Sequence, residues 1–165
     1  MSDETPDAIV KHIFLAADLS RVWQAIANSD QFGKWFGMWL KGPFIAGQEI
    51  TGTIQPTEVN AEVAAMQEPH RGTPVSLVVE EMDPPHVFSF RWRPFAIDKD
   101  KDYSAEPMTL VRFELEAVTG GTNLTITESG FHGIPLERRA QAFAADDGGW
   151  TWQCKLIEAY LARGW

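Results

Sequence analysis

The chain has 165 residues and a mass of 18.5 kDa, and 44% of its residues are hydrophobic, enough to bury a core. Acidic residues outnumber basic ones by 23 to 14, and the net charge of -9 argues against binding to nucleic acid or to anionic membranes. The single cysteine excludes an intrachain disulfide and any cluster held by several thiolates.

The first part of the chain predicts a strand followed by two short helices. Apolar residues at alternating positions predict a strand over residues 9–15. Asp18 and Ser20 are good N-cap residues, and the apolar residues after them recur at helical spacing. A second short helix is expected over residues 31–36, ending near Gly37.

The middle of the chain predicts antiparallel strands joined by turns and by two long connections. The first connection covers residues 55–73 and contains a helical turn at 61–66, and the second covers residues 94–107. The strands are expected over residues 45–54, 75–82, 86–93, 109–117 and 122–129, of which the last two form a hairpin.

From Pro135 onward, apolar residues recur every three or four positions, and this spacing predicts one long helix. Gly148 and Gly149 weaken its middle and indicate either a kink or a close approach to the sheet. A long helix with one apolar face requires a sheet to cover. The order of elements therefore predicts an α+β helix-grip fold. In it, a curved antiparallel sheet wraps around the C-terminal helix, with two short helices after the first strand, as a single domain over residues 1–165.

Four stretches in the same order resemble the activator of heat-shock protein 90 ATPase homologue-like family, which belongs to the START/polyketide-cyclase (SRPBCC) superfamily. They are residues 22–37, which end in Trp-Phe-Gly, and residues 83–92, 127–131 and 149–161. Residues 102–110 resemble a feature of one bacterial branch of that family. The resemblance implies a helix-grip domain with a pocket between the sheet and the C-terminal helix. It leaves the function open, because lipid carriers, hormone receptors and cyclases share this superfamily.

Glu128 departs from the alternation of its strand. It has the same parity as Leu124 and Ile126, which belong to the apolar face. A carboxylate on that face requires a partner or water. Two interpretations stay open. Glu128 either binds a polar group of a ligand or acts as a general acid or base, or it lies at the rim or pairs with a residue of the long helix.

Aromatic residues supply the other site candidates. They share the inward faces of neighbouring strands and of the long helix, which suits a filled core and also suits a pocket wall. The expected wall comprises Phe88, Phe90, Trp92, Phe113, Trp150 and Cys154. The expected border of the entrance comprises Trp35, Phe36 and Tyr103.

The leading hypothesis is a non-enzymatic, cytoplasmic module that binds a small hydrophobic molecule, aromatic or lipid-like, between the sheet and the long helix. One alternative is a cyclase or hydrolase in which Glu128 is the acid or base. Another is a protein-interaction role that includes chaperone regulation or self-association as a dimer. No cofactor is expected, because the sequence has no glycine-rich phosphate loop and no metal-ligand spacing among its histidines.

Overall fold

One curved sheet organises the protein. The computed structural model describes residues 5–94 and 102–163, so residues 95–101 of the expected second connection lie outside the described residues. Within the described ranges, seven strands pair antiparallel throughout, in the order β1-β7-β6-β5-β4-β3-β2. The strands are β1 (Ala8–Leu15), β2 (Met38–Leu40), β3 (Glu49–Ile54), β4 (Pro74–Asp83), β5 (Val87–Trp92), β6 (Thr109–Val118) and β7 (Gly121–Ser129).

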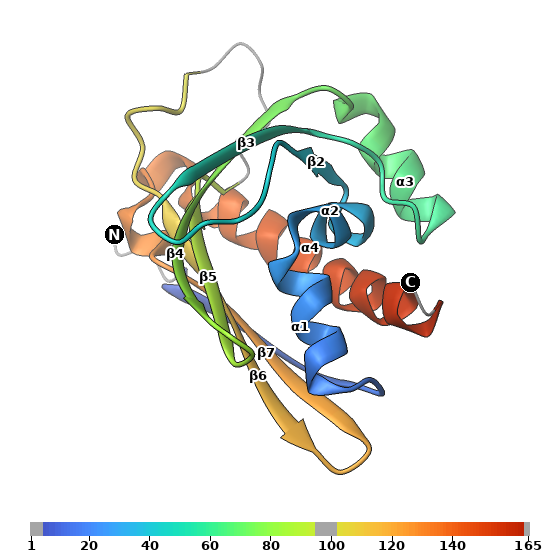
Figure 1. Ribbon diagram of the computed structural model, residues 1–165. Coiled ribbons are helices and arrows are strands. Elements are labelled where there is room, and N and C mark those ends of the chain that lie inside the picture. Colours follow the sequence, from blue (N-terminus) through green and yellow to red (C-terminus); the bar gives the residue numbers. More distant parts are fainter. Residues whose placement is uncertain (1–4, 95–101, 164–165) are drawn as a thin grey trace.

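The long helix α4 (Leu136–Ala162) crosses one face of this sheet, and α1 (Leu19–Ala27) and α2 (Ser29–Phe36) pack beside it (Figure 1). Between β3 and β4 lie α3 (Ala61–Gln67) and the 3-10 helix η1 (Glu68–His70), and a second 3-10 helix, η2 (Phe131–Gly133), precedes α4. The predicted α+β helix-grip fold is therefore confirmed, including the two short helices after the first strand.

Local sequence explains where the short helices begin and end. The Asn28 side chain accepts a hydrogen bond from the backbone N–H of Gln31 and so caps α2. Gly37 ends α2 in the left-handed region at φ 104°, which glycine adopts without steric cost. Asp18 precedes α1 as expected, but its side chain makes no capping hydrogen bond.

Two local expectations, the start of a strand and a close approach of α4 to the sheet, were wrong, and one short strand was missed. The strand expected from residue 45 begins at Glu49, and the pairing of β2 with β3 was not foreseen. A strand of three residues is too short to show a period, which explains the omission of β2. The helix α4 continues through Gly148 and Gly149, and a Cβ at either position would meet nothing within 4 Å. These glycines therefore mark neither a break in α4 nor a close approach to the sheet.

Packed aromatic rings fill the middle of the space between sheet and helices. Phe32 of α2 is fully buried and stacks on Phe36 with 4.8 Å between ring centroids. Its edge-on neighbours from the sheet are Phe90 and Phe113, at 6.2 and 6.3 Å. Such tilted and edge-to-face contacts are the arrangements that aromatic pairs prefer. The part of the interior that these rings occupy is therefore a solid core.

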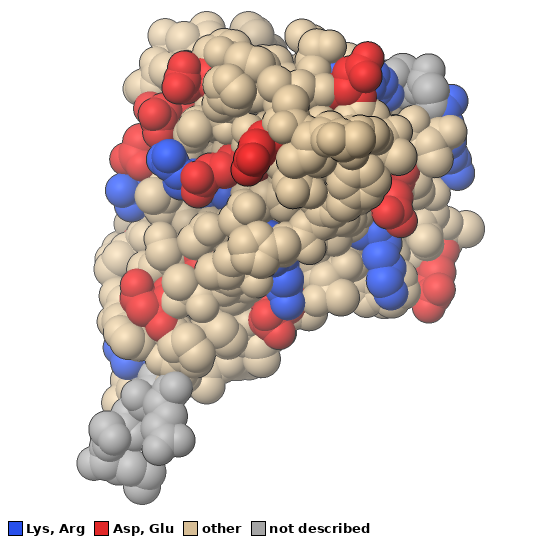
Figure 2. All heavy atoms as spheres, turned by 90° about the horizontal axis from the view of Figure 1, so that it is seen from below, with Lys and Arg blue, Asp and Glu red and all other residues tan. Residues whose placement is uncertain are grey.

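Charged side chains of both signs are interspersed on the face in Figure 2, and the basic ones form no continuous patch there. This distribution agrees with the acidic balance of the sequence. Among the helices of the described residues, none is long and apolar enough to cross a membrane.

Candidate functional site

A cleft of about 1010 Å³ opens beside the aromatic core. Its walls are the end of α2, the end of β3, α3 and η1, the start of β4, the end of β5, residues 102–104 and the middle of α4. Apolar side chains dominate, and they include Phe36, Met38, Ile54, Val75, Leu77 and Trp92. The volume suits a ligand of drug-like size, for which pockets of about 300–1,000 Å³ are typical.

Glu128 lies directly behind this cleft and is completely buried. Its Oε2 accepts hydrogen bonds from Trp92 Nε1 at 2.8 Å and from Thr109 Oγ1 at 2.6 Å. Its Oε1 accepts one from Trp150 Nε1 at 2.8 Å. Three donors around one carboxyl group satisfy its oxygens and offset the cost of burying it.

The sheet register brings these groups together. Trp92 ends β5 opposite Thr109, which begins β6, while Glu128 pairs with Val111 two residues further along β6. Trp150 comes from the middle of α4, where it is almost fully buried. The two indole groups thus approach the same carboxyl group from the sheet and from the helix.

A second carboxyl group, that of Asp146, stands between Glu128 and the cleft. Asp146 lines the cleft one helical turn before Trp150 and shares a side-chain hydrogen bond with Glu128. Burial, the nearby Glu128 charge and this hydrogen bond raise the pKa of Asp146 to about 10, although Arg138 acts in the opposite direction. Asp146 Oδ2 is buried and meets no donor from the described residues. A proton held by Asp146 and donated to the Glu128 carboxylate accounts for both observations.

Three further polar atoms of the cleft lining are buried without a hydrogen-bond partner among the described residues. They are Thr73 Oγ1, Arg93 Nε and Gln153 Oε1. Thr73 as a whole is only 5% exposed. Because these three atoms have almost no accessible surface, they lie behind the wall of the cleft and are not contact points for a ligand.

A buried ion pair holds the described ends of the connection between β5 and β6. Arg138 Nη2 donates to Glu106 Oε1 at 2.6 Å, and both side chains are about nine-tenths buried. Arg138 also donates to the backbone oxygen of Pro94 and lies over the ring of Tyr103 at 5.0 Å. This arginine of α4 therefore anchors the two ends of the connection between β5 and β6, and Tyr103 is held at the cleft.

Of the residues expected at the pocket, Phe36, Trp92 and Tyr103 line the cleft. Glu128 and Trp150 form the layer behind it. Phe88, Phe90 and Phe113 are fully buried within the ring cluster, where they contact other aromatic side chains and do not border the cleft.

Trp35 and Cys154 lie elsewhere. Trp35 is fully buried and donates from Nε1 to the backbone oxygen of Ala25, so it joins α2 to α1 and does not border the entrance. Cys154 is not among the residues that line the cleft, and the charges that act on it are those of Lys11 and Glu158. Burial raises the pKa of its thiol, which makes it a poor nucleophile.

Most residues of the cleft were missed from the sequence, and among them are Thr73, Arg93, Asp146 and Gln153. Strand alternation gives no signal for Arg93, because β5 ends at Trp92 and the alternation ends with it. For the helix a usable signal existed, because Asp146, Trp150 and Gln153 recur at spacings of four and three. The helical face that carries Trp150 therefore also carries Asp146.

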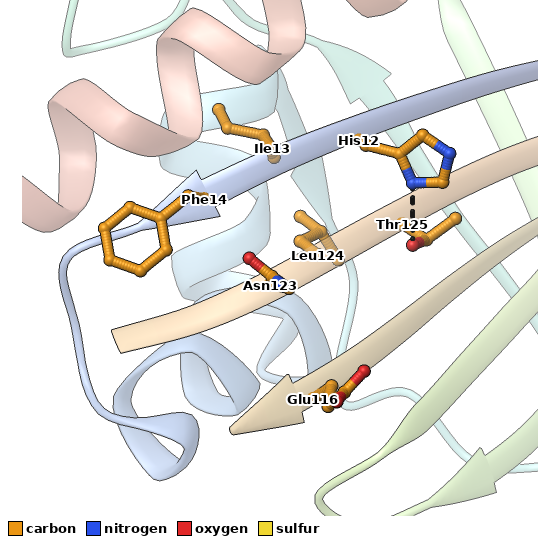
Figure 3. Close-up of a pocket in the computed structure, with 7 residues that line it drawn as sticks. All are labelled: His12, Ile13, Phe14, Glu116, Asn123, Leu124 and Thr125. Atoms are coloured by element: carbon orange, nitrogen blue, oxygen red, sulfur yellow. Dashed lines mark hydrogen bonds between the residues drawn. The ribbon is translucent and has the colours of Figure 1, made fainter. Parts of the chain in front are cut away.

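A second, shallower hollow of about 440 Å³ lies on strands β1, β6 and β7. Figure 3 shows His12 and Thr125 pointing toward each other there, with 3.1 Å between His12 Nδ1 and Thr125 Oγ1. None of the residues expected at the site lines this hollow, and no buried unpaired polar atom of the described residues lies in it. Nor is any group of three or more potential metal ligands present within the described ranges.

Comparisons with known proteins place the chain among proteins of this fold. A family model described as "Activator of Hsp90 ATPase homolog 1-like protein" matches residues 16–162. No curated protein is a significant sequence match. Among solved structures, 212 chains are similar, a breadth that supports the fold without selecting a function.

Three of these structures illustrate the similarity. Protein MLL2253 from Mesorhizobium loti aligns with a TM-score of 0.69 at 17% identity, covering 94% of this chain and 97% of that chain. Protein Ms6760 from Mycobacterium smegmatis aligns with a TM-score of 0.69 at 18% identity, covering 96% and 93%. A protein from Arthrobacter aurescens aligns with a TM-score of 0.71 at 17% identity, covering 95% and 87%.

Proposed function

The chain belongs to the Activator of Hsp90 ATPase homolog 1-like family, and from this premise we propose that it binds a small, largely apolar molecule in the cleft beside α4. One observation carries the proposal. The cleft of about 1010 Å³ has a mainly apolar lining, as is typical of sites that bind small apolar molecules.

The ring-filled core limits the part of the interior that a ligand can occupy. A ligand does not enter the whole space between sheet and helix, because Phe32, Phe90 and Phe113 already occupy its middle. It occupies instead the end near α3, the start of β4 and residues 102–104, where Trp92 and Tyr103 offer ring surfaces. Aromatic walls of this kind favour a flat apolar molecule.

A pair of neighbouring alanines on α4 tests the proposal. Ala145 lines the cleft, whereas Ala144 is exposed and does not. We expect Ala145→Trp to fill the cleft and weaken binding of the neutral probe N-phenyl-1-naphthylamine about tenfold or more, measured by its fluorescence. Ala144→Trp, the matched control, leaves that affinity unchanged. Equal affinity in both variants and the wild type, or no saturable binding by the wild type, would exclude a ligand site in this cleft.

The carboxyl pair favours a second candidate function, general acid–base catalysis. Glu128 is walled off by Trp92, Thr109 and Trp150, so it reaches a substrate only through Asp146, which does line the cleft. A proton taken from a substrate by Asp146 would be matched by movement of the Asp146 proton to Glu128. The test is turnover of a candidate substrate, such as a linear polyketide, by the wild type and by Asp146→Asn. Activity in the wild type that Asp146→Asn abolishes, with folding intact, favours catalysis, and its absence in both favours binding alone.

A protein partner has less support from the geometry. Large apolar residues gather at the end of α2 and in β2, namely Trp35, Phe36, Met38 and Trp39, but of these only Trp39 is exposed. One exposed tryptophan is ordinary for a protein surface.

A further inference from the structure

The sheet has two edge strands, and they differ in length. The strand β2 has three residues, and very short edge strands resist further pairing, whereas β1 has eight residues. The sequence of β1 contains no proline, and its register with β7 is unbroken. In the described sheet, no strand pairs with the other side of β1. This edge is therefore a regular strand with one hydrogen-bonding side open.

The register shows which backbone groups of β1 point to the open side. Gly130 N–H donates to the backbone oxygen of Asp7 at 3.1 Å, and these residues lie opposite each other when the β1–β7 register is continued by one residue. In an antiparallel pair, such hydrogen-bonded residues alternate with residues whose N–H and C=O groups point away. Val10, His12 and Phe14 therefore direct their backbone donors and acceptors to the open side.

The same residues carry side chains on the outer face of the sheet, and two of these are large and apolar. Val10 and Phe14 are 51% and 49% exposed, whereas Ile9 and Leu15, of opposite parity, are buried. His12 lies between them and is also exposed, and Figure 3 shows it with Phe14 beside the shallow hollow. The strand β1 thus offers apolar contact and backbone hydrogen bonds along one line.

The charges of the protein favour this edge for contact between two copies. The chain carries a net charge of -9, so contact between copies is opposed wherever acidic residues meet. The strand β1 contains no acidic residue, and its one lysine, Lys11, pairs with Asp147 of α4 at 2.8 Å. Pairing along β1 therefore brings no carboxylates of this strand together.

One antiparallel register suits two copies of β1. With His12 opposite His12 of the second copy, Val10 of each copy lies opposite Phe14 of the other, and each of these pairs can exchange two backbone hydrogen bonds. A shift that centres the pairing on Lys11 would place two lysines directly opposite each other, which is destabilising. The opposite shift would place Val10 beyond the end of the second strand. Apolar contact and charge thus select the same register.

From this arrangement we propose that the protein forms a symmetric dimer through the open side of β1, which joins two seven-stranded sheets into one continuous sheet. Because both copies use the same edge, the contact closes at two copies, and the short β2 does not extend it. The dimer covers Val10 and Phe14 and pairs the open backbone groups of β1. It leaves the ligand cleft free, because no residue of β1 lines that cleft.

Sedimentation velocity of the full chain over a concentration series tests the association. We expect the wild type to be a dimer at about 100 µM, a concentration at which even weak interfaces are populated. Val10→Lys should weaken the dimer about tenfold or more, because it places a charge in the apolar pair. Ile45→Lys is the matched control, because Ile45 is a β-branched residue that is 45% exposed and lies outside the strands. A monomeric wild type at this concentration, or equal association in both variants, overturns the proposal.

Two further variants test the backbone pairing and its register. His12→Pro removes an N–H from the open side only, which an edge strand tolerates, and should abolish the dimer while thermal unfolding shows a folded monomer. In a Cys154→Ser background, His12→Cys should form a disulfide between copies, since the Cα atoms of a hydrogen-bonded pair are about 5.5 Å apart. Val10→Cys should form none, because four residues along the strand, about 13 Å, would separate the two cysteines. Cross-linking at both positions or at neither overturns this pairing.

Discussion

Asp146→Asn is the variant that most directly tests the carboxyl pair. The asparagine keeps the shape of Asp146, and its amide N–H can donate to Glu128 as the protonated carboxyl group does. It differs in having no proton to release. The comparison with the wild type therefore isolates the titration of Asp146 from the other contacts of α4.

The direction in which the unfolding free energy changes with pH follows from the protonation state of Asp146. In the folded protein the pKa of Asp146 is raised from 3.8 to about 10, so folded Asp146 stays protonated at neutral pH while unfolded Asp146 is ionised. The folded state then binds more protons than the unfolded state over this range. Stability from this group is fully present below about pH 4 and is lost as the pH rises toward 10, at up to about 1.4 kcal/mol per pH unit.

We expect the unfolding free energies of the wild type and Asp146→Asn to diverge as the pH rises. Between pH 5 and pH 8 the wild type should lose up to about 4 kcal/mol of unfolding free energy relative to Asp146→Asn, measured by urea unfolding at each pH. Groups that do not interact with Asp146 titrate alike in both proteins and cancel in this difference, so the divergence reports on the pair of Asp146 and Glu128. Asp147→Asn is the control, because Asp147 is half exposed in its ion pair with Lys11 and should show no such divergence. Parallel stability curves for the wild type and Asp146→Asn would refute the protonated state of Asp146.

Further predictions concern the buried polar groups and α4. Glu128→Ala leaves three buried donors without an acceptor and should cost about 3–5 kcal/mol in urea unfolding, and a loss below 1 kcal/mol would contradict the hydrogen-bond arrangement. Arg138→Met leaves Glu106 buried without its charged partner and should cost about 3 kcal/mol, much of which Glu106→Leu in the same chain recovers. A double variant as unstable as Arg138→Met would disprove the pairing. Gly148→Ala should raise the unfolding free energy by about 1 kcal/mol, because the added methyl group meets nothing, and a destabilised variant would show a hidden contact.

Much of the fold was accessible from the sequence because its signals are local. Two-residue alternation located the strands that form most of the sheet, and helical spacing located α4. The apolar parity of Glu128 correctly placed a carboxyl group on the inner face of β7, where it is fully buried. The same pattern could not choose between a ligand contact and a partner on the helix.

Other features depended on contacts that no local pattern contains. The strand β2 exists because it pairs with β3, and its three residues have no period of their own. Trp35 and Phe36 are neighbours in the sequence, yet one bonds to Ala25 in the core and the other lines the cleft. Which of two adjacent aromatic residues faces a cleft is decided by the angle at which α2 meets the sheet.

The sequence by itself determined the family, the sheet-and-helix architecture and the parity of Glu128 with the apolar face of its strand, since these follow from periodicity and from ordered motifs that span most of the chain. Only the tertiary structure decided that rings fill the middle of the interior, that the open space lies beside Gly149, and that Asp146 stands between Glu128 and this space. The physical reason is that open volume and shared protons arise where elements distant in the sequence meet. Their close packing is set by the shapes of side chains that no single stretch of sequence contains.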